Sequence, residues 1–147
     1  MLFAWMLVAV LMGASIFIQY EALRLISLLI EEVKGPPRRL LLVVVSGTML
    51  AHVVVIGLWA IGYSAATSWM GLGEITTRDP WEIGEFFFFS AESYTSLGLG
   101  DINLKGPVRL LAGLQTLTGL MLIAWSASFT FVAMQRLWEF HKEGQSP

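Results

Sequence analysis

The sequence YTSLGLGD, residues 94–101, places two glycines and an aspartate inside a strongly apolar part of the chain. Four consecutive phenylalanines, residues 86–89, lie shortly before it. Glycine leaves its backbone uncovered, and a bilayer tolerates uncovered polar backbone only where the backbone faces protein or water. The stretch therefore predicts a membrane-embedded segment that faces something polar.

The composition supports a membrane protein. Of the 147 residues, 56% are hydrophobic and only 14% are charged, whereas soluble domains carry about 25% charged residues. A net charge of −2 offers no basic face for a nucleic acid. The absence of cysteine excludes disulfides, thiolate catalysis and cysteine-ligated metals.

Three apolar segments predict membrane-spanning helices. The first covers residues 2–18 and continues with helical spacing through residues 19–34, where Gly35-Pro36-Pro37 ends it. No basic residue precedes Arg24, so we expect this helix to be retained and not cleaved as a signal peptide. Residues 40–65 and 108–138 form the other two spans, each long enough to cross a hydrocarbon core of about 30 Å.

A shorter helix is predicted between the second and third spans. A polar connection over residues 67–80 leads to Asp79 as a helix N-cap, Pro80 at the first helical position and Glu82 at the third. The glycine-rich stretch then interrupts the helix before it could cross a membrane. We therefore expect a helix that enters from one side and returns to the same side.

The basic residues predict the orientation. Six of the nine lie at one end of the predicted spans, where the positive-inside rule places the cytoplasm: Arg24, Lys34, Arg38, Arg39, Arg136 and Lys142. The prediction is a multi-pass protein of the plasma (inner) membrane, with its N-terminus outside and its C-terminus in the cytoplasm.

A span, a half-crossing helix, a glycine-rich strand and another span together resemble the potassium-channel pore family, in its bacterial two-helix form with an additional N-terminal helix. Residues 96–101 match the family's filter sequence T-V-G-Y-G-D position by position. The resemblance implies four chains around one axis, whose carbonyl oxygens replace the hydration shell of potassium. The implied filter residues are Ser96, Leu97, Gly98, Leu99 and Gly100, with potassium bound at the first four and also by the Ser96 hydroxyl.

The resemblance also implies residues that support the filter. Glu92 and Asp101 correspond to a carboxyl pair behind it, and such a pair is expected to share a proton. Phe88 and Phe89 stand where the family usually has tryptophan, and Gly119 corresponds to the glycine at which the inner helix bends. Leu99 replaces the usual tyrosine, so the hydroxyl that tethers the filter in the family is absent.

Several polar residues in the spans have two possible roles. Gln115, Gly119, Ser126 and Thr130 form a thin polar stripe on the third span, which suits pore lining and helix packing about equally; the family position favours the hinge for Gly119. His52 is an ionisable residue in a span, and a neutral imidazole bonded to a neighbouring helix is the better interpretation. Trp59 and Trp125 are interpreted as packing residues.

The fold class predicted is an all-α membrane protein with three spans and one re-entrant helix, assembled as a homotetramer. We expect an N-terminal helix unit (1–37) on the periphery next to the second span, a pore domain (38–138) and a short tail (139–147). The predicted function is passive potassium conduction, with membrane lipids as partners, no cofactor besides the permeant ion, no small-molecule substrate and no enzymatic activity. Two alternatives stay open: a weakly selective cation channel, favoured by Leu99, and a non-conducting membrane subunit that uses the same scaffold for assembly.

Overall fold

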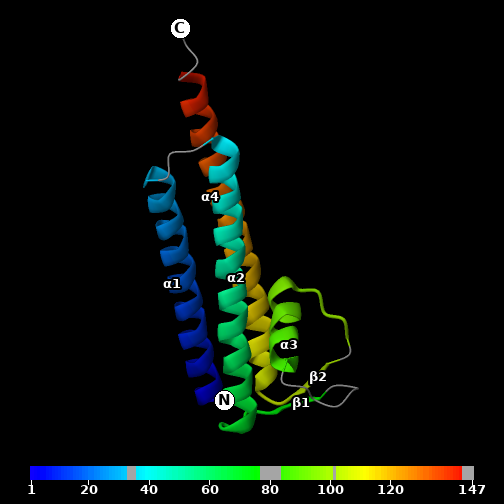
Figure 1. Ribbon diagram of the computed structural model, residues 1–147. Coiled ribbons are helices and arrows are strands. Elements are labelled where there is room, and N and C mark those ends of the chain that lie inside the picture. The colour runs from blue at the N-terminus through cyan, green and yellow to red at the C-terminus, as the bar shows by residue number, and fades with distance from the viewer. Residues whose placement is uncertain (33–35, 77–83, 101, 144–147) are drawn as a thin grey trace.

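The computed structural model describes residues 1–32, 36–76, 84–100 and 102–143. Its elements, in chain order, are α1 (Leu2–Glu32), α2 (Pro37–Ser68), β1 (Glu74–Thr76), α3 (Glu85–Thr95), β2 (Asn103–Lys105) and α4 (Val108–Glu143) (Figure 1). The three predicted spans are confirmed as α1, α2 and α4.

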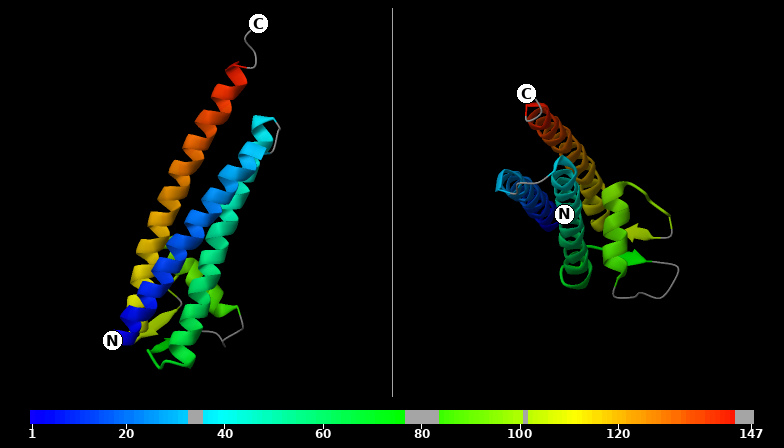
Figure 2. Two further views of the ribbon diagram at one scale, coloured as in Figure 1. Left: turned by 90° about the vertical axis from the view of Figure 1, so that its left-hand side faces the viewer. Right: turned by 45° about the horizontal axis from the view of Figure 1, so that its top comes forward.

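The three long helices run side by side and form the body of the molecule (Figures 1 and 2). Each contains a stretch long and apolar enough to cross a membrane: Leu2–Ile30, Pro37–Ser68 and Val108–Leu137. In an 18-residue apolar window of each stretch, only 22–28% of the residues are buried within the chain. Most of the apolar side chains therefore point outward, where only lipid or another subunit can cover them. The chain is a multi-pass membrane protein.

Proline begins α2 and glycines follow its end. Pro36 is the N-cap and Pro37 the first helical residue, where a missing N–H costs no hydrogen bond. Beyond Ser68, Gly71 and Gly73 take positive φ angles of 58° and 138°, which other residues rarely adopt. A side chain at Gly73 would also collide with the carbonyl oxygen of Lys105. This close approach brings the chain after α2 directly against the chain before α4.

The two short strands are a feature that the sequence did not predict. Strands β1 and β2 pair antiparallel, with Glu74 opposite Lys105 and Thr76 opposite Asn103. The backbone N–H of Val108 extends the contact by donating to the carbonyl of Leu72, at 2.9 Å. Three-residue strands are too short to show a two-residue alternation, and their partners lie far apart in sequence. The pair holds the two ends of the re-entrant segment together.

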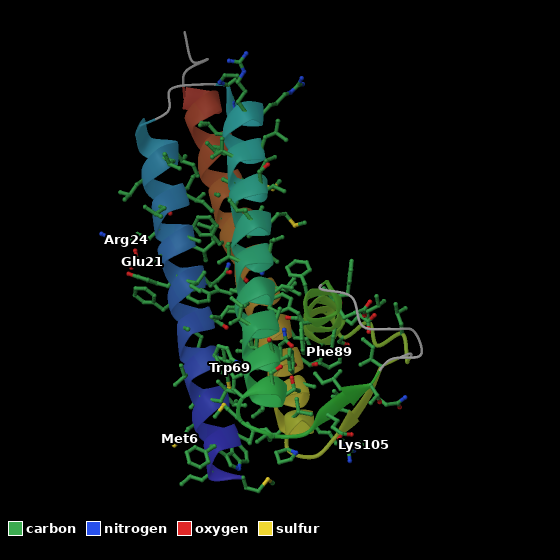
Figure 3. All side chains as sticks on the ribbon, turned by 60° about the horizontal axis from the view of Figure 1, so that its bottom comes forward. Met6, Glu21, Arg24, Trp69, Phe89 and Lys105 are labelled. Atoms are coloured by element: carbon green, nitrogen blue, oxygen red, sulfur yellow. The ribbon has the colours of Figure 1, made fainter. Side chains whose placement is uncertain are left out.

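Helix α1 packs against α2 and α4, on the side away from α3 (Figures 1 and 2). The Trp59 indole N–H donates to Ser15 Oγ at 2.9 Å, and the Gln19 side-chain amide donates to Ser126 Oγ at 2.7 Å. The expected position of the N-terminal helix next to the second span is confirmed, and so is packing as the role of Trp59; its place on the periphery of an assembly stays a prediction. An ion pair between Glu21 and Arg24, with N and O 3.0 Å apart, lies on the outer side of α1 (Figure 3).

Helix α3 lies beside α2 and α4 at the end of the molecule that carries the two strands (Figure 1). It has 11 residues, which at a rise of about 1.5 Å each gives roughly half the thickness of a hydrocarbon core. It therefore cannot span the membrane, as predicted. The predicted start of this helix, with Asp79, Pro80 and Glu82, lies outside the described residues.

Candidate functional site

The C-terminus of α3 turns into the glycine-rich stretch through a defined hydrogen-bonded turn. The Ser96 N–H donates to the Ser93 carbonyl at 3.3 Å, and the Leu97 N–H donates to the Glu92 carbonyl at 3.0 Å. These two bonds make a Schellman ending, in which the residue after the helix is left-handed. That residue is normally glycine, yet here it is Ser96, with φ of 61°. A left-handed conformation costs an L-residue about 1–2 kcal/mol, so a side chain is kept at this position at the expense of stability.

Left-handed residues alternate along the stretch. Ser96, Gly98 and Gly100 have φ angles of 61°, 54° and 79°, while Leu97 and Leu99 between them do not have positive φ. Ser96 is the one residue other than glycine with a positive φ in the part of the chain that the structure describes. In a regular strand, successive residues face opposite sides. Alternating handedness allows successive carbonyl groups to face the same side, which a row of cation-binding oxygens requires.

The stretch lies on the surface of the single chain. Leu97 and Leu99 are 63% and 67% exposed, although both side chains are apolar. Phe88 on α3 is 62% exposed, whereas Phe89 and Tyr94 are buried inside the subunit. Most of the Leu99 side chain is therefore uncovered by the described residues of the chain, and of these three aromatic residues only Phe88 is itself exposed.

A hydrogen-bond network centred on Gln115 joins α3 to both neighbouring helices. The Tyr63 hydroxyl on α2 donates to Gln115 Oε1 at 2.6 Å, and Gln115 Nε2 donates to Ser90 Oγ at 2.7 Å. The same nitrogen lies 3.1 Å from the Ser90 carbonyl, and Ser90 Oγ donates to the Ile56 carbonyl at 2.7 Å. All of these side chains are buried, so in the membrane the network fixes the depth and rotation of α3.

Aromatic packing continues this network. Phe89 lies on the side of α3 that faces α2 (Figure 3), and its ring meets the Tyr63 ring edge-on with centroids 4.8 Å apart. Such edge-to-face pairs contribute about 0.5–1.5 kcal/mol beyond the area they bury. Phe89 thus links α3 to α2, while its support of a filter stays a prediction.

Three of the four residues of the polar stripe on α4 face the inside of the subunit, which favours helix packing over pore lining as their role. Gln115, Gly119 and Ser126 are buried within one chain, and Ser126 accepts its hydrogen bond from α1. A pathway between subunits would be lined by residues that one chain leaves exposed. Polar groups in a membrane need protein partners, and these residues find theirs on the other helices of the same chain. Thr130, further along, is half-buried.

Gly119 packs closely against α3, and helix packing is one of the two roles that its place in the polar stripe left open. A Cβ atom there would collide with the carbonyl oxygen of Tyr94 and lie 3.0 Å from its ring carbon Cδ2. Helix α4 therefore approaches the backbone of α3 as closely as glycine permits. Because α4 continues through this position without a break, bending at Gly119 stays a prediction.

Gly119→Ala is expected to lower the free energy of unfolding by about 1–3 kcal/mol, because the added methyl meets backbone that cannot yield easily. Thermal unfolding of the purified protein in detergent measures the change. Gly113→Ala is the matched control, since Gly113 is on the same helix and a Cβ there would meet nothing within 4 Å. Equal melting temperatures for the two variants would contradict this account of Gly119.

Hydrogen bonds also reach the last turn of α3 itself. His52 Nδ1 on α2 lies 2.7 Å from the Tyr94 hydroxyl oxygen, which confirms that the imidazole is bonded to a neighbouring helix. From α4, the Thr116 hydroxyl donates to the Ser93 carbonyl at 2.7 Å. Sequence reasoning missed Thr116, Ser90 and Tyr63, because each is an ordinary residue of an apolar helix until its partner is known.

The predicted carboxyl pair is only partly described. Glu92 is half-buried on α3, while Asp101 lies outside the described residues, so the shared proton stays a prediction. Trp125, predicted to be a packing residue, is 39% exposed on α4. Within the described residues, no group of three or more His, Cys, Asp or Glu side chains could hold a metal ion.

Three membrane helices, a short re-entrant helix and a strand of alternating handedness define a pore-loop membrane protein. The family model described as "Ion channel" matches residues 40–136, about two thirds of the chain. The chain belongs to this ion channel family, which includes potassium-channel pore domains. The predicted family is thereby confirmed, and α1 lies outside the matched region. Comparisons with curated proteins and with solved structures give no significant match.

Proposed function

We propose that this protein is a potassium channel in which Ser96, Leu97, Gly98, Leu99 and Gly100 of four identical chains line a central filter. The observation that carries the proposal is the alternation of left-handed residues at Ser96, Gly98 and Gly100. Carbonyl oxygens are hard ligands that suit an alkali cation, and rings of them replace its hydration shell. Potassium then crosses passively, with the Ser96 hydroxyl completing the innermost site.

Four copies are proposed because one chain supplies only one filter strand. The exposed side chains of Leu97, Leu99 and Phe88 support the assembly, since apolar groups next to an ion pathway need a protein neighbour. Further large apolar side chains are exposed along α4, at Leu117, Leu120 and Met121. These residues offer the second, deeper part of a contact between subunits.

We place the filter at the outer face of the plasma (inner) membrane. Arg38 and Arg39 lie in the first turn of α2, and Arg136 lies near the C-terminal end of α4. Both of these helix ends are at the end of the bundle away from the strands (Figure 1). By the positive-inside rule that end is cytoplasmic, together with the C-terminus. The N-terminus and α3 then lie on the outer side.

The test is ion flux through the purified full-length protein in liposomes. We expect the liposomes to take up potassium along a potassium gradient and not to take up sodium along an equal sodium gradient. The native mass of the purified protein should correspond to four chains. An assembly of two or three chains would overturn the tetrameric filter. A tetramer that carries no cation would overturn conduction and favour the non-conducting subunit.

A weakly selective cation channel is the second candidate, and Leu99 is the observation that favours it. With its side chain exposed and without a hydroxyl, Leu99 can be held only by packing. Packing resists displacement but does not fix direction as a hydrogen bond does. Reversal potentials in mixed sodium and potassium separate the two candidates.

Leu99→Tyr is expected to raise the potassium preference by restoring a hydroxyl, whose hydrogen bond would contribute about 0.5–1.5 kcal/mol per subunit. The permeability ratio of potassium to sodium should rise by roughly twofold to tenfold. Leu99→Phe is the control, because it adds the ring without the hydroxyl. If both variants give the ratio of the unmodified protein, the lack of a hydroxyl at position 99 does not limit selectivity.

A further inference from the structure

Tyr94 connects the last turn of α3 to both of the helices beside it. It lies two residues before Ser96, and its side chain is buried. Its hydroxyl oxygen is 2.7 Å from His52 Nδ1 on α2, and its ring is tilted 56° to the imidazole with centroids 5.8 Å apart. Its carbonyl group packs on Gly119 of α4. A movement of Tyr94 is therefore resisted from two sides.

The turn that starts the filter depends on the same last turn of α3. The Ser96 N–H is bonded to the Ser93 carbonyl, which also accepts the Thr116 hydroxyl at 2.7 Å. Ser93 and Tyr94 are thus held from α4 and from α2 respectively. Because Ser96 is strained and follows directly, its orientation holds only while the turn before it stays in place.

Two of the filter side chains offer no directional contact: Leu97 and Leu99 carry no hydrogen-bonding group and are largely exposed in the chain. Within the described residues, hydrogen bonds that orient this stretch lie at its inner end, where α3 leads into Ser96.

We infer that His52 is a positioning residue for the ion filter: its hydrogen bond to Tyr94 holds the last turn of α3 against α2 and so fixes the innermost oxygen ring at Ser96. The inference rests on the proposed function, because it assigns a role in ion selection. It also gives a reason for an imidazole within a membrane span, where a polar group is expensive unless it serves a purpose.

The test is a mutant cycle on the full-length protein in liposomes, read out as the permeability ratio of potassium to sodium. Tyr94→Phe removes one oxygen atom and His52→Leu removes the imidazole; each is expected to lower the ratio by roughly threefold to tenfold. The double variant should be no worse than either single variant, since both break one bond. His52→Asn, which keeps a polar atom near the place of Nδ1, should restore the ratio to within about twofold of the unmodified protein.

Tyr20→Phe is the matched control, because Tyr20 is exposed on α1 and its hydroxyl should not affect the ratio. Only variants that elute as intact assemblies are compared. If His52→Leu does not assemble, the permeability ratio of Tyr94→Phe by itself tests the inference. An unchanged ratio in Tyr94→Phe, or additive losses in the double variant, would overturn the role of His52. The proposed function would stand in that case, provided that the unmodified protein conducts potassium. Absence of flux in the unmodified protein would instead overturn the proposed function, and this inference with it.

Discussion

Potassium flux should fall at least about tenfold when Gly98 is replaced by alanine, since each left-handed L-residue costs about 1–2 kcal/mol and four chains repeat the penalty around one axis. Gly98 has φ of 54° and open space around it, so the obstacle is the backbone conformation and not a collision. Ser96 tolerates the same conformation because two bonds to the end of α3 hold the turn. No such helix end adjoins Gly98. Alanine at this position would favour a negative φ and so break the alternation of left-handed residues at positions 96, 98 and 100.

Gly71→Ala is the control for this prediction. Gly71 has φ of 58° and likewise nothing within 4 Å of an added Cβ, but it lies between α2 and β1, away from the filter. The conformational penalty of alanine is therefore about the same at Gly71 as at Gly98, but only Gly98 lies in the proposed filter. Flux measured in liposomes should survive Gly71→Ala. Equal loss in both variants would attribute the effect to folding, and full flux in Gly98→Ala would contradict the assignment of the filter.

Gln115→Met is expected to destabilise the protein by about 2–4 kcal/mol per chain, because it leaves a buried tyrosine hydroxyl without an acceptor and removes the bonds to Ser90. Methionine has nearly the volume of glutamine, so the loss reports the hydrogen bonds and not a cavity. Thermal unfolding in detergent measures the loss. Gln135→Met, at an exposed position of the same helix, should stay within about 0.5 kcal/mol of the unmodified protein.

A second variant tests the same network from α2. Combining Gln115→Met with Tyr63→Phe removes both partners of the 2.6 Å bond, so that no tyrosine hydroxyl is left without its Gln115 acceptor. The double variant should therefore be more stable than Gln115→Met alone. Additive losses would show that the two side chains act independently, contrary to the network.

Elements that depend on local sequence could be predicted. The apolar runs gave α1, α2 and α4, and the interruption by glycine gave a helix too short to span. The backbone conformation of the glycine-rich stretch was predictable in part, because glycine readily takes positive φ, and Gly98 and Gly100 do adopt it. Ser96 follows the same alternation without being glycine, and its left-handed conformation was not predicted, because a serine gives no such signal in the sequence.

Features that depend on which helix faces which could not be predicted. The spacing of Gln115, Gly119 and Ser126 places them on one face of α4, but spacing does not say whether that face meets a pore or another helix. Their buried partners, Ser90 on α3 and Gln19 on α1, lie 25 and 107 residues from the α4 residues that they bond. The pairing of β1 with β2 could not be predicted for the same reason, because the sequence of neither three-residue strand indicates which segment it pairs with.

That strand pair has a consequence for how the chain can change. Pairing of Thr76 with Asn103 closes residues 77–102 into a loop whose two ends meet at one place. The entropy of closing such a loop rises by only about 0.6 kcal/mol for each doubling of its length. Insertions in the connections beside α3 therefore cost little loop entropy, and they leave the register of α2 against α4 unchanged. The connections can thus vary in length, whereas α3 itself has to stay matched to α2 and α4 through Ser90, Tyr94 and Gly119.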